Sequence, residues 1–311
     1  MAAPGSAPSR PIAAPPDLIV SRQLRAPREL VWQVWTDPAH IVKWWGPHRF
    51  TCPHAEIDLR AGGALRFDMR APDGTVFPAI GTVEEVVAPE RLVVTTRLAH
   101  DGVTIAEVQQ TVVLEARGDE TRLTLRAHVR YATEAAAAAL AGMEEGWNQA
   151  LDKMVSYSAT TAAPQEIVIT RRYRAPIETV WEAWTSPERL AAWWGPTGFT
   201  TTTTHFELTP GGRWIHTMHG PDGVDYPNVI TYRDIVPGRR LVYEQTGGRA
   251  GETPIDFRST VVFERDEAGT RLTLRMQVAS AESRRRAIEE FGAYEGGIET
   301  LDRLADFLRV P

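Results

Sequence analysis

Three histidines in the second half of the chain are of a type that could do chemistry. They are His205, His216 and His219, and an imidazole can exchange a proton near neutral pH. Residues 214–219 alternate like a β-strand. Trp214, His216 and Met218 are therefore expected on one face and His219 on the other. Two interpretations of His216 stay open. It is either a buried histidine satisfied by a neighbouring hydroxyl or carbonyl, or a group that contacts a ligand or transfers protons.

A second group, His48, Cys52 and His54, consists of residue types that bind zinc. No further cluster in the sequence completes a four-ligand set with the usual zinc spacing. No local motif gives Cys52 a base that would make it a nucleophile. We therefore expect neither a metal nor a cofactor.

These candidates lie in a chain that repeats itself. Residues 26–47 reappear as residues 175–196, and the correspondence continues far beyond this stretch. Solenoid units recur every 20–50 residues, so a repeat of this length indicates a duplicated domain. The 311 residues suit two domains of about 150 each. The expected parts are a disordered Ala/Pro-rich tail (1–16), domain 1 (17–158), a linker (159–164) and domain 2 (165–311).

Composition excludes several classes of partner. The net charge is −6 and no Lys/Arg run forms a basic stripe, so we expect no nucleic-acid partner. No apolar run approaches the length of about 18 residues that a membrane span needs. Cys52 is the only cysteine, which excludes an intramolecular disulfide and suits the cytoplasm. We expect a cytoplasmic protein whose two domains pack against each other.

Each copy has the pattern of one α+β domain. A short strand opens it, at 18–20 or 167–169, and two short helices follow, the second announced by Asp37-Pro38 and Ser186-Pro187. About six alternating segments then predict an antiparallel sheet. One long helix closes each copy, at 134–157 and 282–308. A curved sheet wrapped around this helix buries both apolar faces.

Several short motifs recur in both copies. The pairs Trp44-Trp45 and Trp193-Trp194 are the most conspicuous, and we expect one tryptophan of each pair to anchor the second helix on the sheet. The motifs of copy 1 are Ala26-Pro27, Val31-Trp32, Trp35-Thr36-Asp37-Pro38, Trp44-Trp45-Gly46-Pro47, Glu56-Ile57-Asp58-Leu59-Arg60, Gly62-Gly63, Pro72-Asp73-Gly74 and Pro89-Glu90-Arg91-Leu92. Those of copy 2 are Ala175-Pro176, Trp181, Trp184-Thr185-Ser186-Pro187, Trp193-Trp194-Gly195-Pro196, Gly211-Gly212, Pro221-Asp222-Gly223 and Arg239-Arg240-Leu241.

These motifs resemble the homology domain of the activators of heat-shock protein 90 ATPase, within the START/Bet v 1-like (SRPBCC) helix-grip superfamily. The resemblance covers both copies nearly end to end. It implies a cavity between the sheet and the long helix, in a superfamily that hosts lipid carriers, hormone receptors, aromatase/cyclases and resistance proteins. The eukaryotic activators pair this domain with a separate N-terminal domain that docks on the chaperone, whereas here a second copy takes up the chain.

Positions that differ between the copies indicate where a ligand would bind. His216 stands where copy 1 has Phe67, and Gly297 aligns with Trp147 of the first long helix. Replacing an indole by hydrogen is expected to leave room, so we predict a roomier pocket with polar handles in domain 2. The predicted ligand-binding residues are Trp194, Trp214, His216, Met218, Asn228, Tyr232, Tyr243, Phe291, Tyr294, Gly297, Ile298 and Leu301 in domain 2, with Phe67, Met69, Met143 and Trp147 in domain 1.

Three functional hypotheses follow. The first is a non-enzymatic protein that binds a small hydrophobic or aromatic molecule, mainly in domain 2. The second is a cyclase- or hydrolase-type enzyme that uses His216, which needs a polar partner within hydrogen-bond reach of the imidazole. The third is a protein-interaction or co-chaperone-like module, which needs an exposed apolar patch. No motif compels catalysis, so the sequence favours the first.

Overall fold

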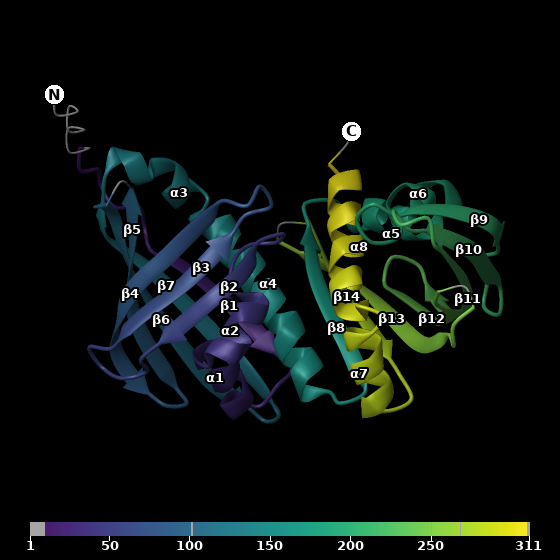
Figure 1. Cartoon of the computed structure of the whole chain (residues 1–311), viewed down its shortest axis with the longest axis horizontal. Helices are drawn as coiled ribbons and strands as arrows, with labels where there is room; N and C mark the ends of the chain where they lie inside the picture. The colour runs from purple at the N-terminus through teal and green to yellow at the C-terminus, as the bar shows by residue number, and fades with distance from the viewer. Residues whose placement is uncertain (1–9, 101, 250, 268, 310–311) are drawn as a thin grey trace. The chain divides into compact units, whose positions relative to one another are not determined.

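The chain forms two domains of the same architecture. The computed structural model describes residues 10–100, 102–249, 251–267 and 269–309. The chain divides into two compact units, residues 1–158 and 159–311, called domain 1 and domain 2 below. Each contains a curled antiparallel sheet, two short helices after its first strand and a long helix near its C-terminal end (Figure 1). The expected α+β helix-grip fold, duplicated in tandem, is confirmed.

In domain 1 the strand order of the sheet is β1-β7-β6-β5-β4-β3-β2. Consecutive strands from β2 to β7 pair as a meander, and β1 returns to pair with β7. The elements are β1 (Leu18–Leu24), α1 (Arg28–Thr36), α2 (Pro38–Trp44), β2 (Thr51–Ile57), β3 (Ala64–Arg70), β4 (Val76–Val87), β5 (Arg91–His100), β6 (Val103–Arg117), β7 (Glu120–Ala132), the 3-10 turn η1 (Glu134–Ala136), α3 (Ala137–Ala141) and α4 (Met143–Ala162).

Domain 2 repeats this order as β8-β14-β13-β12-β11-β10-β9. Its elements are β8 (Glu166–Tyr173), α5 (Ile177–Thr185), α6 (Pro187–Trp193), β9 (Thr200–Phe206), β10 (Arg213–His219), β11 (Asp225–Val236), β12 (Arg240–Gly247), β13 (Ile255–Asp266), β14 (Gly269–Gln277), α7 (Ala281–Glu289) and α8 (Ala293–Phe307). Among the described residues, no helix is long and apolar enough to cross a membrane.

The prediction of one uninterrupted closing helix per copy was wrong. In domain 1 the helix is broken at Gly142, between α3 and α4. In domain 2 it is broken between α7 and α8, where Gly292 has a φ of 58° and begins the second segment. A left-handed backbone ends a helix, and glycine adopts it without a steric cost. The 3.6-residue pattern predicted the buried stripe but not these interruptions.

The predicted tail and linker also need correction. Residues 1–9 of the tail lie outside the described residues. The amide of Ile12 donates to the carbonyl of Ala132, and Pro11 bridges Thr133, so this part of the tail is ordered against the end of β7. The helix α4 continues to Ala162, so the first four residues of the predicted linker are helical.

The first tryptophan of each pair joins the second short helix to the helix before it, whereas the expected anchor was on the sheet. Trp44 and Trp193 are completely buried. Their indole N–H groups donate to the carbonyls of Val34 (2.8 Å) and Ala183 (3.0 Å), on the preceding helix. A buried indole with its N–H satisfied fixes two helices at once, because it supplies both apolar area and a directional bond. Both copies depend on this anchor, so it belongs to the fold.

Candidate functional site

The side chain of His216 points into the interior of domain 2. It lies on β10 and is 1% exposed. Its ring stacks on Trp214, with 3.9 Å between ring centroids, and meets Trp194 edge-on at 6.0 Å. The strand alternation therefore predicted its direction correctly. The second tryptophan of the domain 2 pair thus forms part of the wall around an imidazole.

The imidazole of His216 is buried without a hydrogen-bond partner. By donor–acceptor geometry neither Nδ1 nor Nε2 has one among the described residues, although the backbone of Trp214 interacts with the ring. Burial disfavours the charged ring and lowers the pKa of His216 from 6.5 to about 3, and the interaction with the Trp214 backbone opposes this shift only in part. At neutral pH the ring is therefore uncharged, with one nitrogen that can donate and one that can accept. Buried polar groups in proteins are nearly always paired, so an imidazole with two unused nitrogens needs an explanation.

Other polar side chains line the same face of the sheet. Tyr232, Tyr243 and Ser259 occupy one row of the strand register, on β11, β12 and β13, and all three are buried. Burial raises the pKa of both tyrosines, so they are neutral phenols. The sequence did not point to Ser259, because its counterpart in copy 1, Gln110, is also polar. Only positions that change from apolar to polar between the copies stand out.

The side chain of Asn228 is already satisfied. It lies beside His216 in the strand register and is 4% exposed. Its amide nitrogen donates to the carbonyl of Tyr226 at 2.8 Å, and its oxygen accepts from Gln245 at 3.0 Å. The register neighbour of Asn228 on β12 is Gly247, where a Cβ would lie 1.9 Å from the Asn228 oxygen. Glycine at this position therefore leaves room for the Asn228 amide.

The space expected at Gly297 is occupied, which corrects the prediction that the lost indole leaves room there. A Cβ built on Gly297 would lie 2.5 Å from Cδ1 of Ile169 and 3.6 Å from the terminal methyl of Met276. The corresponding residues of copy 1 are the smaller Val20 and Ala127. Larger side chains on β8 and β14 thus fill the volume that Trp147 takes in domain 1.

The remaining predicted residues of domain 2 take different places. Met218 packs under the turn after α6, where its sulfur lies 3.4 Å from a Cβ built on Gly195. Phe291 lies beneath the guanidinium of Arg286, 5.2 Å from ring centroid to Cζ. Three predicted residues of α8 pack in the main core, namely Tyr294, Ile298 and Leu301.

Domain 1 fills the equivalent interior with apolar rings. Trp45 contacts Phe67 at 4.7 Å and Trp147 at 5.4 Å between centroids. Met69 packs against the turn at Gly46, as Met218 does in domain 2. Met143 does not join this group, since it packs in a separate small cluster near the end of β7. The comparison of copies identified the contrast between Phe67 and His216 correctly.

The other candidate groups of the sequence do not assemble. His205 is exposed, and His219 pairs with Asp225 at 2.6 Å, so the three histidines are not one cluster. The thiol of Cys52 donates to the carbonyl of His54 at 3.3 Å, and burial raises its pKa. No group of three or more His, Cys, Asp or Glu that could hold a metal ion occurs within the described parts of the chain.

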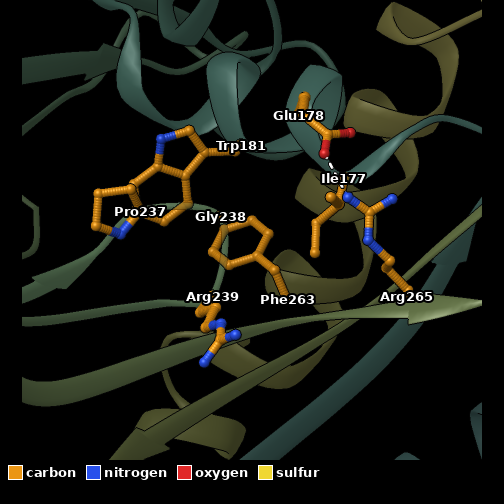
Figure 2. Close-up of a pocket in the computed structure, with 8 residues that line it drawn as sticks. All are labelled: Ile177, Glu178, Trp181, Pro237, Gly238, Arg239, Phe263 and Arg265. Atoms are coloured by element: carbon orange, nitrogen blue, oxygen red, sulfur yellow. Dashed lines mark hydrogen bonds and ion pairs between the residues drawn. The ribbon is translucent and has the colours of Figure 1, made fainter.

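A pocket of about 590 Å³ opens elsewhere in domain 2 (Figure 2). Its apolar wall consists of Ile177 and Trp181 from α5 and Phe263 from β13. The turn between β11 and β12 forms the opposite side and carries Arg239. At the rim, Arg265 is paired with Glu178 at 2.5 Å. The sequence analysis did not single out this pocket, because its residues are not adjacent in any motif.

Residues 25–159 and 174–309 match the family model of the Activator of Hsp90 ATPase homolog 1-like proteins. The chain belongs to this family. No curated protein matches the chain.

Two solved structures of single-domain size are similar to one half of this family member, and a third is similar to nearly the whole chain. One from Arthrobacter aurescens is 26% identical over 48% of this chain and 88% of its own, with a TM-score of 0.45. Protein Ms6760 from Mycobacterium smegmatis is 25% identical over 47% of this chain and 91% of its own, with a TM-score of 0.43. DynU16, from the dynemicin biosynthetic locus, is 18% identical over 94% of this chain and 99% of its own, with a TM-score of 0.37.

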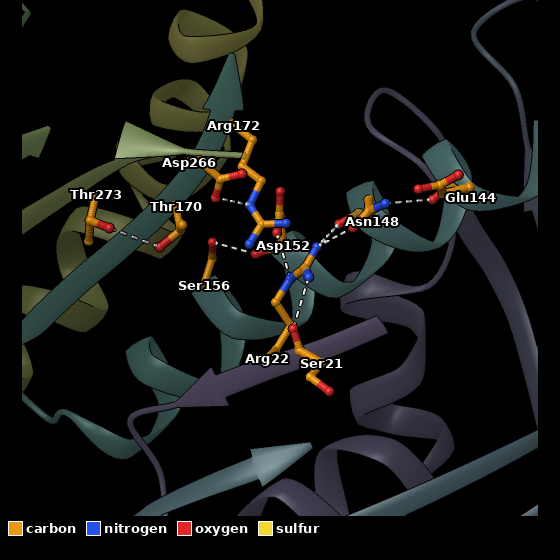
Figure 3. Close-up of polar contacts among 10 residues, drawn as sticks. All are labelled: Ser21, Arg22, Glu144, Asn148, Asp152, Ser156, Thr170, Arg172, Asp266 and Thr273. Carbon is orange, nitrogen blue, oxygen red and sulfur yellow. Dashed lines mark hydrogen bonds and ion pairs between the residues drawn. The ribbon is translucent and has the colours of Figure 1, made fainter. Parts of the chain in front are cut away.

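Both activator-homolog domains contain a buried ion pair that the sequence analysis missed. Nε of Arg22 on β1 lies 3.1 Å from Asp152 on α4, and Arg22 also donates to Asn148 at 2.7 Å (Figure 3). In domain 2, Arg171 on β8 pairs with Asp302 on α8 at 2.5 Å. All four charged side chains are at least nine-tenths buried. The signal was present in the sequence, because each residue recurs as the same type in both copies.

A second shared contact joins the long helix to the turn after the short helices. Nζ of Lys153 donates to the carbonyls of Gly46 and Phe50, both at 3.1 Å. Nη1 of Arg303 donates to the carbonyls of Gly195 (2.9 Å) and Pro196 (3.0 Å). In both domains, therefore, one buried ion pair and one cation bonded to backbone carbonyls hold the long helix in place. We call these shared contacts the family frame.

Proposed function

We propose that domain 2 binds a small, neutral, planar aromatic molecule beside His216. The observation that carries the proposal is the buried imidazole whose two nitrogens have no partner within the described residues. A site that binds small molecules typically combines apolar and aromatic walls with a few polar groups. Trp194 and Trp214 supply such walls around this ring.

The chemistry of the site favours a neutral ligand. The low pKa of His216 keeps the ring uncharged, and Tyr232 and Tyr243 are also neutral. A ligand hydroxyl or N–H would meet the accepting nitrogen, and a ligand acceptor would meet the donating one. Its aromatic body would pack among indole rings, where offset and edge-on contacts are favourable.

The same observations disfavour the enzymatic alternative. A general acid or base works best with a pKa near the operating pH, and that of His216 is about 3. No polar side chain of the described residues lies within hydrogen-bond reach to orient the ring. The co-chaperone-like alternative stays a prediction.

Titration of the full chain with 2-naphthol, followed by tryptophan fluorescence, tests the proposal. We expect His216→Phe to weaken binding about tenfold, since one hydrogen bond contributes on the order of 1–1.5 kcal/mol. His219→Phe is the matched control, because this histidine lies on the same strand but is partly exposed and paired with Asp225. Equal affinities for the wild type and His216→Phe would contradict the proposal, as would an equal loss in both variants.

A further inference from the structure

The pocket on the α5 side of domain 2 combines an apolar wall with a cation. Trp181 and Phe263 meet edge-on at 5.3 Å between ring centroids, with 69° between the ring planes. Of the two arginines at its edge, Arg265 is engaged by Glu178. Arg239 forms no ion pair among the described residues and is exposed. The pocket therefore offers a rigid aromatic surface beside one unneutralised guanidinium.

Domain 1 has an ion pair at the same place. The correspondence is fixed by a shared backbone bond, since the Leu114 amide donates to Glu90 as the Phe263 amide donates to Arg239. Where domain 2 has Ile177, domain 1 has Arg28, which donates to Glu90 at 3.0 Å. An ion pair thus spans the site in domain 1. In domain 2 both of its members are replaced, one by an apolar residue and the other by the opposite charge.

We propose that this pocket is a second small-molecule site, which takes an aromatic carboxylate. The apolar body would pack on Trp181, Phe263 and Ile177, and the carboxylate would pair with Arg239. A guanidinium binds a carboxylate through two parallel hydrogen bonds, which lysine cannot match. The volume of about 590 Å³ lies within the range of about 300–1,000 Å³ typical of small-molecule sites. This site goes beyond the proposed function, since it shares no residue with the surroundings of His216.

Calorimetric titration of the full chain with naphthalene-2-carboxylate tests the site, with naphthalene-2-carboxamide as the uncharged comparison. We expect the carboxylate to bind at least tenfold more tightly than the amide and to weaken with added salt. Arg239→Glu should lower its affinity at least tenfold. Arg240→Glu is the matched control, because Arg240 is the adjacent exposed arginine but pairs with Asp234 at 2.8 Å outside the pocket. It should leave the affinity within twofold of wild type.

A double substitution separates closure of the pocket from loss of folding. Ile177→Arg with Arg239→Glu recreates the pair that domain 1 already tolerates, so the chain should fold and the carboxylate should no longer bind. His216→Phe should leave carboxylate binding unchanged, which distinguishes this site from the proposed interior one. The inference is overturned if the amide binds as tightly as the carboxylate, if the double variant binds like wild type, or if His216→Phe abolishes carboxylate binding.

Discussion

The interiors of the two domains differ in one way that is compensated and one that is not. Domain 1 places Trp147 where domain 2 has Gly297, and domain 2 refills the volume with Ile169 and Met276. The change from Phe67 to His216 has no such compensation, because the imidazole is buried with its nitrogens unpaired. Close packing forces volume changes to be matched by neighbours. Polarity that the protein leaves unmatched is therefore the better indicator of a ligand.

The comparison also separates the contacts that both domains share from those that only one domain has. The anchors Trp44 and Trp193, the buried Arg–Asp pairs and the cation on the turn carbonyls occur in both domains. The closed ion pair of Arg28 and Glu90 in domain 1 becomes an open pocket in domain 2. In these examples the shared contacts each join two elements, whereas the contact that differs lies at the pocket.

The largest expected effect comes from breaking a shared ion pair. Arg22→Met in domain 1 and Arg171→Met in domain 2 should each destabilise their own domain by about 3–5 kcal/mol, because each removes the arginine that pairs with a buried carboxylate. Hydrogen exchange of peptides from each domain, measured in the full chain, reports the two separately. Adding Asp152→Leu to Arg22→Met should restore much of the stability. A loss below about 1 kcal/mol in both single variants would show that the pairs do not stabilise their domains.

The next largest effect on stability is expected from removing Trp147, whose volume other side chains fill in domain 2. Trp147→Gly should destabilise domain 1 by about 2–4 kcal/mol through the cavity it leaves, with the indole only partly buried. Adding Val20→Ile and Ala127→Met, the residue types of domain 2, should recover about 2 kcal/mol, at about 0.8 kcal/mol per buried methylene. The same exchange measurement applies. No recovery in the triple variant would mean that the two packing sets are not interchangeable.

Counted per pH unit, the smallest effect is a pH dependence confined to domain 2. Unfolded His216 binds a proton below its ordinary pKa of 6.5, whereas the folded residue does so only near pH 3. Stability is therefore fully present above pH 6.5 and falls as the pH drops from about 6.5 toward 3, by up to about 1.4 kcal/mol per pH unit. His216→Phe should remove this slope from unfolding curves of domain 2, and His219→Phe should keep it. Identical slopes in wild type and His216→Phe would contradict the burial argument.

Strand periodicity and duplication predicted most of the fold. The order of elements, the antiparallel sheet, the caps at Asp37 and Ser186 and the inward direction of His216 follow from residue type and spacing, which are local properties. The breaks at Gly142 and Gly292 were missed, since the apolar stripe continues across them. The filled space at Gly297 was missed because Ile169 and Met276 lie far from it in sequence.

The sequence by itself determined the family fold and the position where the two copies diverge in polarity. Those features depend on which residue types recur at a fixed offset, and a duplicated chain displays that directly. Only the tertiary structure decided which buried polar groups are satisfied, since Asn228 finds two partners across the sheet and His216 finds none. Only the tertiary structure revealed the pocket at Arg239, because α5, β13 and the β11–β12 turn form its walls together. Hydrogen bonding and cavity shape depend on contacts between distant segments, which no local pattern encodes.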